Sequence, residues 1–237
     1  MIRTIRYWLA VVLATGWYGG KVIVSALAGV RQVPGGVYDR SQQSWARMLL
    51  RWTGVEVDVV HAERIEPGRG CVYISNHTSW LDIWALLDTL PGIRFVFKKQ
   101  FLYIPVLGTA MRRIGHIAVD RAKRHSAVAA YDAAAGEVRA GTPAVVFAEG
   151  TRSRDGRLHP FKRGPFVLAI TAQVPVVPVF CEHTFALLPK GALAPRPGTI
   201  RVHIGEPIPT AGLTYEARDT LSDQAHRAVI RLGATQA

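Results

Sequence analysis

The sequence predicts an α/β fold with a mixed, largely buried sheet of about seven strands flanked by helices. Short apolar runs typical of buried strands alternate with longer stretches that have helical periodicity or are rich in Ala. This alternation starts near Tyr38 and continues almost to the C-terminus, which favours strands separated by helices in one layered domain. The chain has 237 residues, 49% of them apolar, so it can form one sizeable core and is not intrinsically disordered.

The first part of the chain differs in composition from the rest. We therefore divide the protein into residues 1–37, expected to form N-terminal hydrophobic membrane-anchoring helices, and residues 38–237, expected to form the α/β domain. Residues 5–30 are apolar apart from one arginine, one lysine and a few small polar residues. The uncharged run 7–20 covers 14 positions, whereas a straight membrane span needs about 20 residues.

Two arrangements of this N-terminal segment remain open. One is a single tilted span over residues 5–30, with Lys21 extending its charged end to the interface. The other, slightly favoured, is a pair of short helices that break at Gly19-Gly20 and dip into one leaflet, because a Gly pair is a poor helix interior. A secretory signal peptide is disfavoured, since no clear cleavage site precedes a polar mature start.

The charge of the chain suggests an anionic partner. Lys and Arg number 29 against 17 Asp and Glu, which gives a formal net charge of +12. The basic residues recur in short groups beside apolar segments, which favours anionic membrane lipids over nucleic acid. Arg3 and Arg6 favour a cytoplasmic N-terminus, so we expect the cytoplasmic (inner) membrane, with the domain on its cytoplasmic face. Cys71 and Cys181 lack a CxxC spacing and are interpreted as reduced thiols, which fits that face.

Each element of the domain is predicted from its own pattern and its own ends. Pro91-Gly92 stops one helix, Pro105 stands near the start of the next, and Gly141 ends the Ala-rich one. The predicted helices, amphipathic or Ala-rich, cover residues 42–52, 83–90, 104–114, 122–140, 166–172 and 215–232. The predicted strands, short apolar or alternating runs, cover residues 55–60, 71–75, 94–97, 117–120, 144–148, 176–180 and 200–204.

A histidine and an aspartate stand together after one of the predicted buried strands. His77 follows the strand at residues 71–75, and Asp82 enters the next apolar run five positions later. Residues at this spacing lie roughly 140° apart around a continuous helix, so the two can meet only if His77 lies in the loop before the helix. Thr78 or Ser79 would then cap that helix. An imidazole with a carboxylate partner can take a proton from a hydroxyl near neutral pH; the alternative is a capping network without catalytic function.

A second polar loop, residues 149–153, follows the buried strand predicted at 144–148. Gly150 allows the backbone to approach a ligand closely, and the planar guanidinium of Arg152 suits a phosphate. Two hydroxyl side chains in the loop add donors, although an ordinary turn would have the same composition. Because ligands gather at the ends of strands in such sheets, the two loops together favour a shared binding site.

Four sequence blocks in order resemble the glycerolipid acyltransferases. Residues 76–82, Asn-His-Thr-Ser-Trp-Leu-Asp, match the NHxxxxD block of that family, and residues 97–121 resemble its second block. Residues 147–153 match the third block and residues 174–179 the fourth. The resemblance extends over about residues 55–208, and the chain is similar to the bacterial 1-acyl-sn-glycerol-3-phosphate acyltransferases of this family.

The resemblance implies an O-acyltransferase of phospholipid biosynthesis that makes phosphatidic acid from lysophosphatidic acid. His77 would be the general base on the sn-2 hydroxyl, and Asp82 would orient and charge-stabilise its imidazole. The acyl donor would be an acyl-CoA or acyl-ACP thioester, with no cofactor and no metal. The residues expected to bind substrate are Lys99, Arg121, Glu149, Gly150, Thr151, Arg152 and Ser153.

Other functions stay open at this stage. The same chemistry would serve another lysolipid acceptor, such as a lyso-ornithine lipid or another lysophospholipid, although the loop at residues 149–152 favours a phosphate. A membrane scaffold with a dead site is disfavoured because His77 and Asp82 are both present, and a nucleic-acid binder accounts for the charge alone. The sequence contains no GxSxG nucleophile elbow, no HExxH or CxxC zinc spacing and no Gly-rich nucleotide loop.

Overall fold

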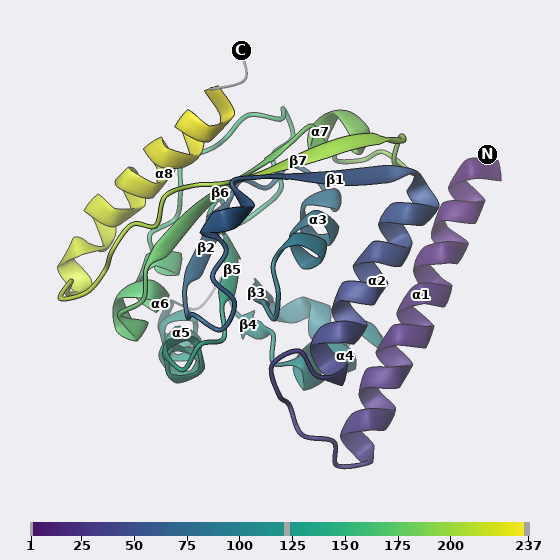
Figure 1. The fold of residues 1–237 in the computed structure, drawn as a ribbon, viewed down its shortest axis with the longest axis horizontal. Helices are drawn as coiled ribbons and strands as arrows, with labels where there is room; N and C mark the ends of the chain where they lie inside the picture. Colours follow the sequence, from purple (N-terminus) through teal and green to yellow (C-terminus); the bar gives the residue numbers. More distant parts are fainter. Residues whose placement is uncertain (1, 121–123, 235–237) are drawn as a thin grey trace.

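The computed structural model describes residues 2–120 and 124–234, and Figure 1 shows the arrangement of their helices and strands. The α-helices are α1 (Ile2–Leu27), α2 (Val37–Thr53), α3 (Leu81–Thr89), α4 (Leu107–Ile114), α5 (Arg124–Arg139), α6 (Gly164–Ala172), α7 (Thr184–Leu187) and α8 (Arg218–Ala234). The strands are β1 (Val55–Val60), β2 (Val72–Ser75), β3 (Arg94–Lys98), β4 (Ile117–Val119), β5 (Ala144–Phe147), β6 (Val176–Glu182) and β7 (Gly198–Ile204). Three short 3-10 helices complete the described elements: η1 (Ala62–Arg64), η2 (Lys99–Tyr103) and η3 (Tyr215–Ala217).

The strands form one seven-stranded sheet in the order β1-β7-β6-β2-β5-β3-β4. The β6–β7 pair is antiparallel and the other neighbouring pairs are parallel, so the predicted mixed sheet is confirmed. Strand β2 lies between β5 and β6, with Ser75 paired to Phe147 on one side and to Val179 on the other. The carboxyl ends of β2 and β5 therefore lie side by side, although about 70 residues separate them in the chain.

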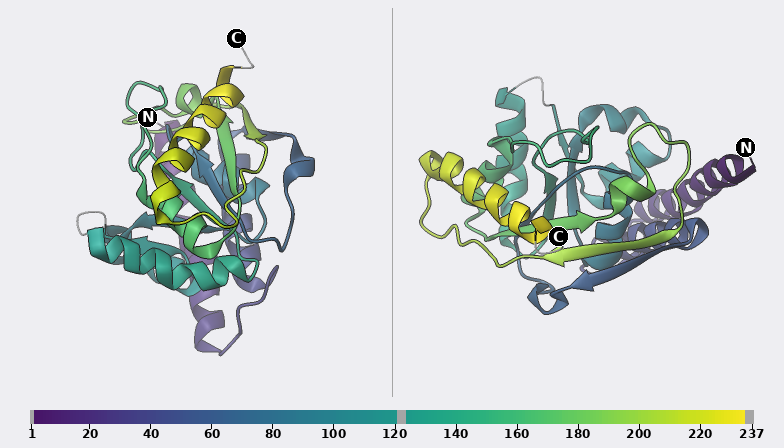
Figure 2. Two further views of the ribbon diagram at one scale, coloured as in Figure 1. Left: turned by 90° about the vertical axis from the view of Figure 1, so that its left-hand side faces the viewer. Right: turned by 90° about the horizontal axis from the view of Figure 1, so that it is seen from above.

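Helices cover both faces of the sheet. One face packs against α2 and α3, and the other packs against α5, α6 and α8. In Figures 1 and 2, α1 and α8 lie on opposite sides of the molecule, with the sheet between them. All four residues of β2 and of β5 are buried, which explains why these strands are continuous apolar runs in the sequence.

Helix α1 is a single unbroken helix that runs alongside α2 and α4 (Figure 1). The predicted break at Gly19-Gly20 is therefore wrong. A Cβ atom on Gly19 would lie 2.7 Å from Cγ1 of Val106, so the missing side chain lets the start of α4 approach α1 closely. Tyr7 and Ala14 on the inner face of α1 belong to the same apolar cluster as α2 and α3, so tertiary packing compensates for the weak helix propensity of the glycines.

The outer face of α1 is apolar and exposed. Among the helices of the described residues, α1 is the one that is long and apolar enough to cross a membrane by length and composition. Trp17 is 72% exposed and Val12 is 65% exposed. The surface of a soluble protein seldom includes so continuous an apolar face. The outer face of α1 is therefore expected to contact a membrane or another protein.

Candidate active site

His77 and Asp82 meet at the carboxyl end of β2. His77 lies in the loop between β2 and α3, as predicted, and Asp82 is in the first turn of α3. The His77 Nδ1 and Asp82 Oδ2 atoms are 2.8 Å apart, and the aspartate side chain is fully buried. Because the carboxylate accepts a hydrogen bond from Nδ1, the imidazole is held in the tautomer that leaves Nε2 free to accept a proton.

The Asp82 carboxylate also fixes the loop that carries the histidine. Oδ2 accepts hydrogen bonds from the backbone N–H groups of Thr78 and Ser79, each at 2.8 Å. The expectation that Thr78 or Ser79 caps α3 holds for Ser79: Trp80 at the N-cap position makes no side-chain cap, but the Ser79 hydroxyl accepts a hydrogen bond from the backbone N–H of Leu81, the first residue of α3, at 3.2 Å. The Thr78 hydroxyl pairs with that of Thr184, and the Ser79 hydroxyl also donates to the Leu188 carbonyl oxygen.

The second loop, after β5, supports His77 from the other side. Glu149 accepts hydrogen bonds from the backbone N–H of His77 at 2.7 Å and from that of His159 at 3.1 Å. The backbone N–H of Ser153 donates to the His77 carbonyl oxygen at 2.8 Å. The imidazole stacks on the ring of Phe147, with centroids 3.8 Å apart. Contacts from two loops therefore determine the position and tilt of the imidazole.

Glu149 has a positioning role in this arrangement. Its side chain is buried, and both carboxylate oxygens accept backbone N–H groups. Burial raises the pKa of Glu149 to about 7, and the two backbone hydrogen bonds oppose that shift. A carboxylate that holds the His77 loop in place is poorly suited to contact an anionic substrate directly.

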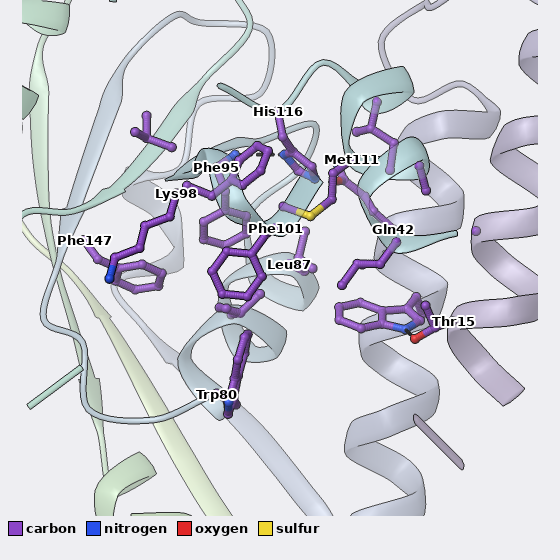
Figure 3. A pocket seen from close by; sticks show the side chains of 18 of the residues that line it. Thr15, Gln42, Trp80, Leu87, Phe95, Lys98, Phe101, Met111, His116 and Phe147 are labelled. Carbon is purple, nitrogen blue, oxygen red and sulfur yellow. Dashed lines mark hydrogen bonds between the residues drawn. The ribbon is translucent and has the colours of Figure 1, made fainter. Parts of the chain in front are cut away.

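A cavity of about 270 Å³ opens from His77 toward α1, α2 and α4. Figure 3 shows Phe147 and Lys98 at one side of this cavity and Gln42 and Thr15 at the other. Between the two sides lie apolar and aromatic side chains, namely Trp80, Leu87, Phe95, Phe101 and Met111. The base thus stands at the polar end of a long, mainly apolar space, which suits a hydrocarbon chain with a reactive head.

Three cationic side chains line the polar end with His77: Lys98, Arg152 and Lys190. The guanidinium of Arg152 lies 5.0 Å from the centre of the Trp80 ring. Burial lowers the pKa of Arg152, and the nearby Asp82 opposes this shift. Desolvation is the main cause that lowers the pKa of Lys190. The positive charges of Arg154, Arg152 and Lys98 lower this pKa further. Within the described residues none of the three forms an ion pair, so this end of the cavity attracts an anion.

The predicted substrate-binding residues separate into three groups. Gly150, Thr151 and Arg152 line the cavity with His77. Lys99 is exposed in η2 and does not line the cavity, whereas its neighbour Lys98 does. Arg121 lies outside the described residues.

Ser153 and Lys190 show what the sequence could not reveal. Ser153 is buried and its hydroxyl donates to Asp155 at 2.7 Å, so it supports the loop without facing the cavity. Lys190 reaches the site from the segment after α7, and no local sequence signal marks it. Lys98 stands in a Lys-Lys pair, so composition alone could not distinguish it from Lys99.

Comparison with known proteins identifies the family to which this chain belongs. The family model described as Acyltransferase matches residues 56–182, which includes both loops of the site. This chain belongs to the acyltransferase family. The acyltransferase is 38% identical over 203 residues to the chloroplastic 1-acyl-sn-glycerol-3-phosphate acyltransferase BAT2 of Brassica napus, covering 81% of this chain and 57% of that protein. It is 34% identical over 188 residues to human 1-acyl-sn-glycerol-3-phosphate acyltransferase beta, covering 78% of this chain and 67% of that protein.

A solved structure matches the acyltransferase along nearly its whole length. The crystal structure of the 1-acyl-sn-glycerophosphate acyltransferase PlsC from Thermotoga maritima aligns with a TM-score of 0.80 and 26% sequence identity. The match covers 98% of this chain and 95% of the PlsC chain. The Brassica relative is longer, and the acyltransferase spans little more than half of its length. The predicted fold and family are thereby confirmed.

Proposed function

We propose that this acyltransferase transfers an acyl chain from acyl-CoA or acyl-ACP to the sn-2 hydroxyl of 1-acyl-sn-glycerol 3-phosphate, which gives phosphatidic acid. One observation carries the proposal: a base oriented by a carboxylate shares one cavity with three unpaired cations and a long apolar wall. A lysophosphatidate has the matching parts, namely a hydroxyl, a phosphate monoester and a hydrocarbon chain. The names of the relatives support the same acceptor.

The reaction follows from the positions of the groups. Nε2 of His77 takes the proton of the sn-2 hydroxyl as its oxygen attacks the thioester carbonyl carbon, and Asp82 stabilises the imidazolium that forms. The tetrahedral intermediate then expels the thiolate, which receives the proton from Nε2. One ester bond forms and one thioester bond breaks. Since a thiolate is a good leaving group, the reaction needs neither a covalent enzyme intermediate nor a cofactor.

The cations give the acceptor its orientation. A phosphate monoester carries close to two negative charges at neutral pH and accepts hydrogen bonds from guanidinium and ammonium groups. Lys98, Arg152 and Lys190 would hold this group, while the acyl chain extends along the apolar wall. Bound in this way, the acceptor hydroxyl lies near His77 without any contact from the buried Glu149.

An acyl-transfer assay with a panel of acceptors tests the proposal. The purified protein is given lysophosphatidate, a lysophospholipid with a phosphodiester headgroup, and a lyso-ornithine lipid, each with acyl-CoA and with acyl-ACP. Lysophosphatidate should have the highest kcat/KM with at least one donor. Transfer to the phosphate-free acceptor alone would contradict the proposed acceptor while leaving the acyl-transfer chemistry in place.

A matched pair of arginine variants tests the phosphate contact. Arg152→Ala should raise the KM for lysophosphatidate about tenfold, because a charge-assisted hydrogen bond to the phosphate is lost. Arg154→Ala, which removes an exposed arginine two positions away that does not line the cavity, should change the KM little. Equal effects of the two substitutions would mean that net charge, and not the Arg152 contact, attracts the acceptor.

We further propose that the exposed face of α1 lies in one leaflet of the membrane at its cytoplasmic face. The helix packs side-on against α2 and α4 along its length, which a helix that crosses the bilayer alone would not do. Trp8 and Trp17 on the outer face suit the interface between lipid and water. A spin label at position 17 should be accessible to lipid-soluble quenchers in vesicles; protection equal to that of a label at the exposed Asp223 would contradict this placement.

A further inference from the structure

A second cavity, of about 500 Å³, lies outside the catalytic site. It is enclosed by the first turns of α1, the C-terminal end of α2 and the segment before β7, which meet at one corner of the molecule (Figure 1). Arg3, Arg6 and Arg51 line it, together with the aromatic ring of Trp52, which is 56% exposed. Neither the established family nor the proposed reaction assigns a role to this cavity.

The charge in this second cavity is not balanced by the protein. Its lining includes no Asp and no Glu. None of the three arginine side chains forms an ion pair or a hydrogen bond with any residue in the described part of the chain. Guanidinium groups gathered in a hollow repel one another, and their planar donor sets match the oxygens of a phosphate. An anion bound here would therefore be stabilised by all three.

The second cavity opens at the same edge of the sheet as the catalytic one. Because β6 and β7 are antiparallel, the start of β7 lies beside the carboxyl end of β6, where Arg201 pairs with Glu182. Gly54 and Pro197, which line the second cavity, directly precede β1 and β7 at this edge. Tyr7 lines the cavity, and its ring centre is 6.2 Å from that of Trp84 in α3. The Trp84 ring centre is in turn 6.2 Å from that of Trp45, which lines the first cavity, so two ring contacts connect the walls of the two cavities.

We propose that the second cavity is a phosphate-binding site for a phosphate ester other than the acceptor. This rests on the proposed function, in which the acyl donor's carrier and the surrounding anionic lipid both carry phosphate esters, whereas the catalytic cavity has one group of cations. The arginines would bind the phosphate oxygens, and Trp52 would pack against the remainder of the ligand at the rim. The donor's carrier and the lipid headgroup share this chemistry, so experiment has to separate them.

The test measures binding without turnover. Titration calorimetry of the full-length protein in detergent gives the Kd for coenzyme A and for 3′-dephospho-coenzyme A, and flotation measures binding to phosphatidylcholine vesicles with and without phosphatidylglycerol. The variant Arg3→Gln/Arg6→Gln/Arg51→Gln should weaken one of these interactions at least about tenfold. Arg31→Gln/Arg112→Gln/Arg227→Gln removes the same charge from exposed positions outside the cavity and should weaken it much less.

The outcomes separate the sources of the phosphate. Weaker binding of coenzyme A assigns the site to the donor's carrier, and a smaller effect on the dephospho form would place the 3′-phosphate at the arginines. Weaker binding to phosphatidylglycerol vesicles alone assigns the site to lipid headgroups. Equal losses in the cavity variant and the control variant, in both arms, would overturn the site.

Two further readouts keep the result interpretable. The thermal unfolding temperature of each variant shows that it is folded, and Arg3→Lys/Arg6→Lys/Arg51→Lys, which keeps the charge but not the planar donors, should bind with intermediate affinity. Since binding is measured with no acceptor present, failure to acylate lysophosphatidate would contradict the proposed function without affecting this result. Normal acylation with unchanged binding would contradict only the second site.

Discussion

The catalytic corner and the apolar wall of the same cavity are built by different forces. At the corner, His77 donates hydrogen bonds to Asp82 and Glu149 and stacks on Phe147, so that two strand-end loops determine the position of one imidazole. The wall combines apolar side chains of the helices α1, α2, α3 and α4 with aromatic side chains of β3 and η2. Hydrogen bonds determine the orientation of the imidazole, whereas apolar packing determines the volume of the cavity.

This difference predicts different responses to substitution. A small chemical change at the corner should remove a charge or a proton acceptor from the reaction and reduce the rate. A change of size in the wall should alter which acyl chain fits and leave the chemistry of the thioester unchanged. The following predictions test this separation, from the largest expected effect to the smallest.

Replacing the base should have the largest effect. His77→Ala should lower kcat by about 10²–10⁴-fold or more, because no other described group takes the proton of the hydroxyl. His159→Ala is the matched control, since that histidine lies in the neighbouring loop, pairs with Asp155 and does not line the cavity. Single-turnover kinetics with lysophosphatidate, and the unfolding temperature of both variants, provide the measurement. A His77→Ala protein with near-normal kcat would remove this residue as the base.

Two substitutions of Asp82 separate its charge from its hydrogen bonds. Asp82→Asn keeps an oxygen for the N–H groups of Thr78 and Ser79, so it should lower kcat by about 10²-fold with little loss of stability. Asp82→Ala leaves these donors unpaired in a buried site and should also destabilise the fold by about 1–3 kcal/mol. Urea unfolding and kcat are measured for both. Equal stability of the Asn and Ala variants would mean that the carboxylate does not fix the loop.

Filling the wall should change selectivity and not chemistry. Ala110→Leu adds three carbon atoms to a buried position that lines the cavity, and it should lower kcat/KM for long acyl chains about tenfold relative to chains a few carbons shorter. Gly16→Leu is the control, because a side chain there meets no atom within 4 Å. An equal loss of kcat/KM for all acyl chain lengths would show that a change in the wall also disturbs the position of His77.

The pKa of Glu149 predicts a change in stability that depends on pH. Its pKa is raised from 4.5 to about 7, so the folded protein binds this proton more tightly than the unfolded chain does. The stabilisation is fully present below about pH 4.5 and is lost as the pH rises through about 7. Relative to Glu149→Gln, which cannot titrate, the wild type should therefore lose about 3 kcal/mol of unfolding free energy across this window. Parallel urea-unfolding profiles of the two proteins between pH 4 and pH 8 would contradict the shift.

The sequence was sufficient to predict the seven strands, most of the helices and the meeting of His77 with Asp82, but not the short helix α7. The buried strands β2 and β5 are continuous apolar runs, and His77 and Asp82 lie close in the chain, so local patterns identify them. The meeting of the His77 loop with residues 149–153 depends on the pairing of β2 with β5, which no local pattern encodes. The resemblance to a family supplied that long-range information.

Three features of the site and its surroundings depend on tertiary structure alone. Whether Lys98 or Lys99 faces the cavity depends on the direction in which β3 ends, and Lys190 arrives from a segment more than 100 residues after His77. Gly19 and Gly20 were expected to break α1. The penalty of about 1 kcal/mol for each Gly is small compared with the packing of α1 against α2 and α4, so the helix continues.

Helix α1 has a consequence for how the protein can be handled. Its outer face is exposed and apolar, while Thr15, Tyr18 and Val22 on its inner face line the catalytic cavity. A shortened protein that lacks residues 1–30 would therefore gain solubility by opening the substrate cavity to water. Detergent chosen for purification would compete for the same hydrocarbon-binding space, so the choice of detergent becomes a variable of the enzyme assay itself.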